Sequence, residues 1–155
     1  MTIRGRRKME NGLIDDENRK SPALLGIVKG NWIGDAFKYF QNSGKNKLYF
    51  YSNSKQIKNA GNKRIIHVYF KATDRSSKEF LVIAKADFVE ITNKNPVEYR
   101  LQGSESDEGL YYYGFRNLRK LNNEIKLTEL RNFNKGTKLS NSTRGATIII
   151  DPEID

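Results

Sequence analysis

The sequence contains no cysteine and no long apolar run among its 155 residues. The lack of cysteine excludes disulfide bonds and thiolate metal sites. No apolar stretch approaches the ~20 residues that cross a membrane, and none follows the basic N-terminus as it would in a secretory signal. We therefore expect an intracellular, cytoplasmic protein that has no membrane partner.

Residues suited to catalysis are also scarce. The one histidine, His67, falls in the middle of a predicted strand, where a packed or hydrogen-bonded side chain is a better interpretation than a general base. A metal-dependent nuclease needs clustered carboxylates beside a lysine. The nearest approach is Asp74, Glu79 and Lys85, whose spacing matches no such motif and which we interpret as surface charges. We predict no catalytic residue, metal ligand or cofactor, with a nuclease as the alternative.

Positive charge is abundant. The chain has 28 lysines and arginines against 18 aspartates and glutamates, which gives a net charge of +10. Such an excess favours a polyanionic partner, of which nucleic acid is the commonest. A second alternative is a protein-interaction module whose charge serves solubility. Residues 1–22 have few apolar side chains and predict a flexible charged arm, followed by one domain over residues 23–155.

The most informative stretch is Lys47-Leu-Tyr-Phe-Tyr-Ser-Asn-Ser-Lys55. Its aromatic content and alternating side chains predict a strand. The short polar residues Ser52 and Asn53 follow, which are typical of a turn. A partly buried strand would thus hold hydrogen-bonding groups at a rim, although a core strand with an ordinary turn has the same pattern.

Other segments repeat this short-strand pattern. We expect strands over residues 23–28, 64–71, 79–92 (bent near 85–87), 110–116 and 146–150, and short helices over 35–40 and 127–133. Six or seven short strands with little helix predict a mainly β, α+β fold that curls into a barrel. A barrel removes the exposed edges of such aromatic strands.

Trp32 is the only tryptophan, and it lies between Gly30 and Gly34. Glycines let the backbone approach a ligand closely, and an indole offers a face on which a base can stack. The alternative is a core anchor beneath a loop. Five basic residues flank the loops around Trp32 and Ser52, and they predict a cationic rim: Lys38, Lys55, Lys58, Lys63 and Arg64.

Four blocks together resemble the EVE domain, a PUA-like domain related to the YTH and ASCH domains. They are Asn31-Trp-Ile-Gly-Asp35, residues 48–55, residues 111–121 with 125–130, and Lys138-Leu-Ser140. The resemblance covers about residues 24–155 in the order of the family. It implies a PUA-like barrel that reads a modified or flipped base, as in modification-dependent restriction systems or readers of modified RNA.

The resemblance also implies roles for individual residues. The expected base pocket consists of Trp32, Gly34, Tyr51, Ser52 and Asn53. The expected phosphate contacts are Lys38, Lys55, Lys58, Lys63, Arg64, Arg116, Arg119 and Arg144. We expect nucleic acid as the partner, modified DNA more than RNA, in a larger restriction or processing complex.

Overall fold

The computed structural model of the chain describes residues 20–29, 31–53, 64–73, 80–143 and 145–155. Most of the predicted N-terminal arm therefore lies outside the described residues, and Pro22 already belongs to the first strand. The elements are β1 (Pro22–Lys29), α1 (Trp32–Asn42), β2 (Leu48–Ser52), β3 (His67–Thr73), β4 (Leu81–Thr92), the 3-10 turn η4 (Val97–Tyr99), β5 (Tyr111–Lys126), the 3-10 turn η5 (Leu127–Glu129) and β6 (Thr147–Ile150).

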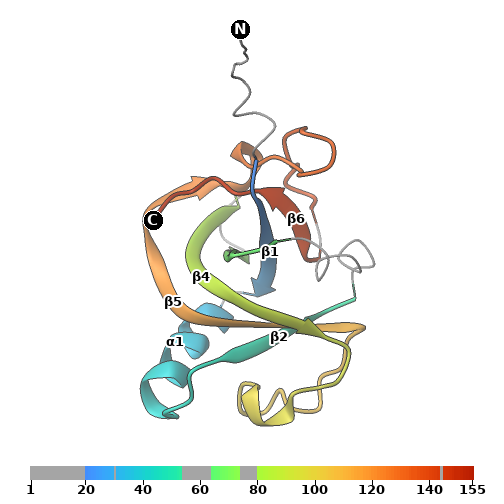
Figure 1. Cartoon of the computed structure of the whole chain (residues 1–155). Helices are drawn as coiled ribbons and strands as arrows, with labels where there is room; N and C mark the ends of the chain where they lie inside the picture. Colours follow the sequence, from blue (N-terminus) through green and yellow to red (C-terminus); the bar gives the residue numbers. More distant parts are fainter. Residues whose placement is uncertain (1–19, 30, 54–63, 74–79, 144) are drawn as a thin grey trace, which may run out of the picture.

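The described strands form one six-stranded sheet in the order β2-β5-β4-β3-β1-β6. Only β1 and β3 pair in parallel; the other neighbours are antiparallel. The sheet curls into a half-barrel, and α1 lies at one end of it (Figure 1). Register shifts between β4 and β5, including one between Lys85 and Asp87, accompany this curvature, as β-bulges commonly do. The prediction of a mainly β, curved α+β fold is confirmed, and one of the register shifts falls where the bend near residues 85–87 was expected.

Both faces of the sheet are buried. One apolar cluster fills the inside of the curl and contains Phe50, Phe70 and Phe115, with Trp32 of α1 packed against it. The second cluster lies on the other face, where Tyr69 is among the fully buried side chains. A strand that is covered on both sides has buried residues at successive positions and an apolar sequence. Residues 23–26 of β1 are all buried and have such a sequence.

The helix differs from its predicted limits. We expected a loop over residues 30–34 and a helix from Asp35, whereas α1 begins at Trp32. The buried residues Ile33 and Ala36 and the half-buried Phe37 and Phe40 recur at the spacing of one helical face, and this pattern outweighs the glycine in the first turn. Asn31 occupies the N-cap position without a side-chain capping bond.

The predicted helix over residues 127–133 is wrong. Only Leu127–Glu129 form a single 3-10 turn, and the strand expected over 110–116 continues as β5 to Lys126. The chain beyond the turn pairs with other segments: Leu139 N donates to Leu130 O at 2.9 Å, and Ile150 N donates to Arg131 O at 2.9 Å. These backbone bonds replace the bonds that a helix would have made, and the buried leucines pack without it.

Gly114 of β5 leaves room for the ring of a tyrosine on the neighbouring strand β2. It pairs directly with Tyr49, and a Cβ at this position would lie 2.6 Å from the Tyr49 ring. The ring is buried, and its hydroxyl donates to a carboxylate oxygen of Glu90. An added methyl group therefore cannot be accommodated by a simple movement of the ring.

We expect Gly114→Ala to lower the free energy of unfolding by about 1–3 kcal/mol, as overpacked sites do. Gly34→Ala is the matched control, because nothing lies within 4 Å of its Cβ position, and in a helix it should stabilise by about 0.5–1 kcal/mol. Urea unfolding of both variants measures the difference. Equal stability of the two variants would contradict the packing described here.

Candidate functional site

A cavity of about 400 Å³ opens beside the end of β2. Four of the five predicted base-pocket residues line it: Trp32, Tyr51, Ser52 and Asn53. Its other walls include Arg100, Leu101 and Asp107, together with Gly145 and Ala146, which immediately precede β6. The cavity thus combines aromatic side chains with amide, hydroxyl and charged groups, and its size is that of a typical small-molecule site, ~300–1,000 Å³.

The end of β2 holds its polar side chains by long-range hydrogen bonds. Ser52 is buried, and its Oγ accepts a hydrogen bond from Ala146 N at 3.3 Å, which ties the two edges of the half-barrel together. Asn53 is exposed, and its Oδ1 accepts from Leu110 N at 3.0 Å. With Oδ1 occupied, the Asn53 amide offers its Nδ2 donors to a ligand. The rim predicted from the Ser-Asn sequence is therefore built on a fixed scaffold.

Tyr51 is the exposed aromatic of this strand. Its neighbours Tyr49 and Phe50 are buried, whereas the Tyr51 side chain is 42% exposed. The Arg100 guanidinium lies over the Tyr51 ring, 5.6 Å from its centre, and so makes a cation–π contact with it. An exposed ring in the wall of a cavity is a stacking surface for a flat ligand.

Trp32 has two roles in the structure. Its indole stacks on Phe70 with ring centres 6.0 Å apart and contacts the rings of Phe50 and Phe115. It is only half buried and also lines the cavity. The two interpretations from sequence, core anchor and cavity wall, both describe this residue. Gly34 lies exposed in α1 and does not line this cavity, so its place in the base pocket stays a prediction.

Sequence reasoning missed Arg100. Its side chain is only 5% exposed, and Nη1 donates to Asn95 Oδ1 at 2.7 Å and to the Asp107 carbonyl at 3.0 Å. The guanidinium also lies 5.1 Å from the Tyr112 ring centre. Among the described residues, no carboxylate forms an ion pair with it. Its hydrogen-bond partners lie within seven residues of it in the sequence, but its contact with Tyr51 is made only by the fold.

A second, larger cavity of about 790 Å³ lies between α1 and residues 97–105. Lys38, Lys45 and Tyr39 line it from the side of α1 and the loop that follows. The Tyr39 hydroxyl donates to Lys47 O at 2.8 Å. Burial and the nearby Tyr99 raise the pKa of Tyr39 to about 12, so this hydroxyl remains a neutral donor at physiological pH.

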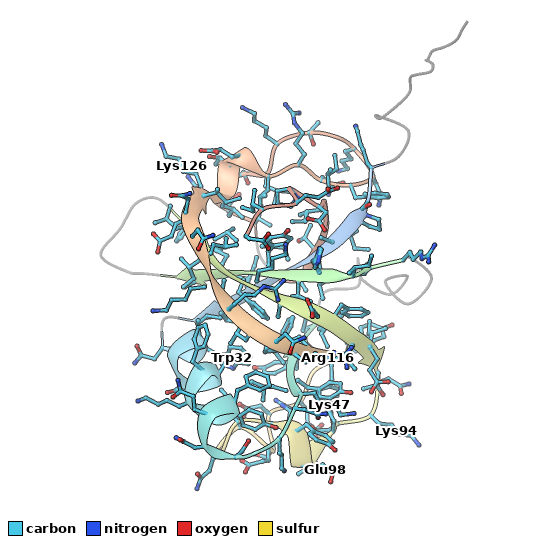
Figure 2. The ribbon with its side chains drawn as sticks, turned by 60° about the vertical axis from the view of Figure 1, so that its left-hand side comes forward. Trp32, Lys47, Lys94, Glu98, Arg116 and Lys126 are labelled. Carbon is cyan, nitrogen blue, oxygen red and sulfur yellow. The ribbon has the colours of Figure 1, made fainter. Side chains whose placement is uncertain are left out.

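The predicted phosphate-contact residues are dispersed. Lys38 lines the larger cavity, whereas Arg64 precedes β3, and Arg116 and Arg119 belong to β5 (Arg116 and Trp32 are labelled in Figure 2). None of these four lines the smaller cavity, and Arg119 pairs with Asp87 at 3.2 Å. Lys55, Lys58, Lys63 and Arg144 lie outside the described residues, so the cationic rim stays a prediction there.

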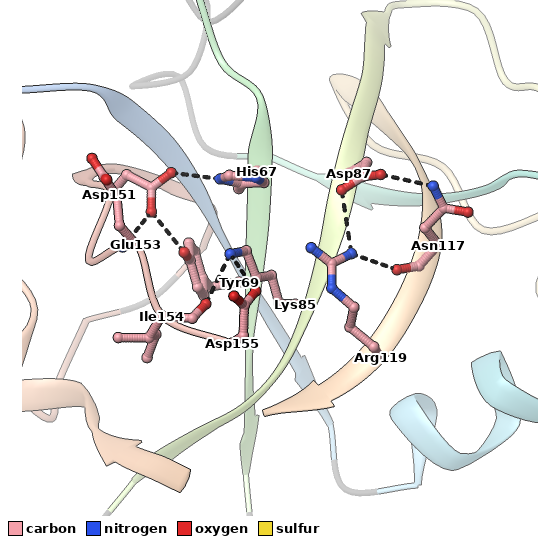
Figure 3. A network of polar contacts seen from close by, with 10 residues as sticks. All are labelled: His67, Tyr69, Lys85, Asp87, Asn117, Arg119, Asp151, Glu153, Ile154 and Asp155. Atoms are coloured by element: carbon pink, nitrogen blue, oxygen red, sulfur yellow. Dashed lines mark hydrogen bonds and ion pairs between the residues drawn. The ribbon is translucent and has the colours of Figure 1, made fainter. Parts of the chain in front are cut away.

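His67 belongs to a polar network on the opposite face of the sheet from the aromatic cluster (Figure 3). Its Nδ1 lies 2.7 Å from Asp151 Oδ2, and Tyr69 Oη donates to Asp151 Oδ1 at 2.6 Å. Lys85 Nζ donates to Ile154 O at 2.8 Å and to Asp155 Oδ1 at 3.1 Å. The interpretation of His67 as a hydrogen-bonded side chain agrees with these contacts. The network fastens residues 151–155 to the sheet.

The nuclease alternative gains no support from the same region. Asp74 and Glu79 lie outside the described residues, and Lys85, interpreted from sequence as a surface charge, is buried and hydrogen-bonded. Within the part of the chain that is described, no group of three or more histidine, aspartate or glutamate side chains is arranged to hold a metal ion. That part also contains no helix with the length and apolarity to cross a membrane.

Comparison of the chain with protein-family models and with curated proteins gives no match. The functional conclusion therefore depends on the residues and geometry of the site itself.

Proposed function

We propose that this chain is a non-catalytic nucleic-acid-binding module that reads one base, in a modified form, in the 400 Å³ cavity at the end of β2. The observation that carries the proposal is the convergence of Tyr51, Asn53 and buried Arg100 on this cavity. A flat apolar surface, amide donors and a cation are the groups that bind a nucleotide.

The chemistry of the cavity suits a base more than an apolar ligand. Stacking on an aromatic side chain supplies ~1–3 kcal/mol per base and works for any base, so it provides affinity. Polar wall groups, among them Asn53, Ser104 and Asp107, offer hydrogen bonds to a base edge. A base or substituent that leaves such a group unpaired loses ~1–3 kcal/mol, which provides selectivity.

The net charge of +10 supports a polyanionic partner, but it does not identify that partner. Affinity that decreases steeply with salt would indicate that phosphates contribute. We propose modified DNA, in preference to RNA, as the partner.

We expect Tyr51→Leu to weaken binding of a base-modified oligonucleotide by about 5- to 100-fold, because the stacking surface is lost. Asn53→Ala should reduce the preference for the modified over the plain oligonucleotide. The fluorescence of Trp32, the only tryptophan, can report binding in a panel of single-stranded DNA and RNA that contains 5-methylcytosine, 5-hydroxymethylcytosine or N6-methyladenine.

Ile66→Ala is the matched control, because Ile66 is exposed and lines neither cavity. It should leave every affinity unchanged. If Tyr51→Leu and Ile66→Ala bind all oligonucleotides alike, the cavity is not the binding site and only the basic surface remains.

A further inference from the structure

The two cavities adjoin. Trp32, Arg100, Leu101 and Ser104 line both of them, so they share one wall. Arg100 is the charged residue of this shared wall. A ligand that extends from the smaller cavity into the larger one would follow the wall to which Arg100 belongs.

Arg100 differs from two other buried charged side chains, Lys85 and Asp151. Lys85 has an aspartate partner, and buried Asp151 has His67. Among the described residues, Arg100 donates hydrogen bonds to two neutral oxygens, and two tyrosine rings flank it. A buried cation is costly unless an anion compensates it. A guanidinium has five donor hydrogens in a planar fork, which suits a phosphate.

The larger cavity has a mixed rather than a uniformly positive lining. Its basic side chains besides Arg100 are Lys38 and Lys45, and its acidic ones are Asp35, Glu98 and Glu105. Lys45 Nζ also donates to the carbonyl of Glu98. Such a lining does not suit a run of phosphates. It suits one polar nucleoside that follows a single phosphate.

We propose that the larger cavity is the subsite for the nucleotide adjacent to the base that is read, with the phosphodiester between the two nucleotides held at Arg100. This inference rests on the proposed function. The ligand that the site recognises is then a dinucleotide unit with its central phosphate. Lys38 contacts the second nucleotide and does not contact the first.

A change in the ligand tests the inference without altering the protein. For each modified base of the panel, three probes are compared: the nucleoside, the dinucleotide with a normal phosphodiester, and the same dinucleotide with a neutral methylphosphonate linkage. The phosphodiester form should bind about 10-fold or more tightly than the other two, since a hydrogen bond to a charged group contributes more than a neutral one. Lys38→Gln should weaken only the dinucleotides, and Asn53→Ala should weaken all three probes.

The two proposals fail separately. Equal affinity for the nucleoside and both dinucleotides would overturn the subsite and leave the base pocket in place. Equal affinity for the two dinucleotides, both above that of the nucleoside, would overturn the role of Arg100. Absence of binding of every nucleoside and dinucleotide in the panel would overturn both proposals. Because the linkage is changed on the ligand, a fold defect in a protein variant cannot produce these results.

Discussion

Replacing Asp151 with alanine is expected to lower the free energy of unfolding by about 1–3 kcal/mol, the usual cost of leaving a buried hydrogen-bond donor without its acceptor. The carboxylate accepts hydrogen bonds from Tyr69 Oη at 2.6 Å and from Glu153 N at 2.7 Å, and it pairs with His67 Nδ1 at 2.7 Å. Alanine leaves three donors without an acceptor, and the Tyr69 side chain is fully buried.

Two further variants show whether the loss of stability comes from the contacts of Asp151. Asp151→Asn keeps one oxygen acceptor and should cost less than alanine. Asp155→Ala removes a carboxylate from Lys85, but Asp155 is 77% exposed, so its effect should be much smaller. Guanidinium chloride unfolding at pH 7 measures all three. Equal losses for Asp151→Ala and Asp155→Ala would show that the buried network does not hold the C-terminal segment.

We expect the free energy of unfolding to decrease steeply as the pH rises above 10. Tyr49, Tyr69 and Tyr113 are fully buried, and burial raises the pKa of each above the ordinary value of 10.0. Hydrogen bonds to Glu90 and Asp151 raise the pKa values of Tyr49 and Tyr69 further. These phenols remain protonated in the folded state at pH values where the unfolded chain has released their protons.

The sign of the pH dependence follows from this difference. Folded-state pKa values above 10 give stability that is complete below pH 10 and is lost as the pH rises further. Each tyrosine contributes about 1.4 kcal/mol per pH unit, so the three together contribute about 4 kcal/mol per unit above pH 10. With a typical stability of ~5–15 kcal/mol, we expect the protein to unfold within a few pH units above 10.

Tyr113→Phe isolates one contribution to this slope. Among the described residues, the Tyr113 hydroxyl has no hydrogen-bond partner, so its removal should not destabilise the fold at neutral pH. The slope of the free energy of unfolding against pH between 10 and 11 should decrease by about one third. An unchanged slope, measured by urea unfolding at each pH, would mean that Tyr113 titrates in the folded state as it does in the unfolded chain.

Most of the sheet could be predicted from the sequence, since alternation and aromatic content locate β1, β2, β4 and β6 to within a few residues. The length of β5 could not be predicted. Its second half is polar because several of its side chains are exposed, and a strand with exposed polar residues resembles a loop. A helix over residues 127–133 was predicted because Leu127 and Leu130 are spaced as in a helix, but both residues are held by backbone bonds to other segments.

The candidate site was predictable where its residues are neighbours in the sequence. Tyr51, Ser52 and Asn53 follow from a strand that ends in polar residues, and they line one cavity with Trp32. Arg100 was not predicted, because its place beside Tyr51 and in the wall of the cavity is set by the fold. The start of the helix at Trp32, which places Gly34 in the first turn, was not predicted because the apolar periodicity of α1 was underestimated.

The central claim is that the cavity beside β2, and not the basic exterior, binds the nucleic acid. Nuclear magnetic resonance of the isotopically labelled protein, titrated with the tightest-binding modified dinucleotide, tests it most directly. The account predicts that the first and largest shifts occur at the amides of residues 51–53 and at the Arg100 side chain. Shifts confined to Arg116, Arg119 and Lys120 on β5, with residues 51–53 unaffected, would contradict it.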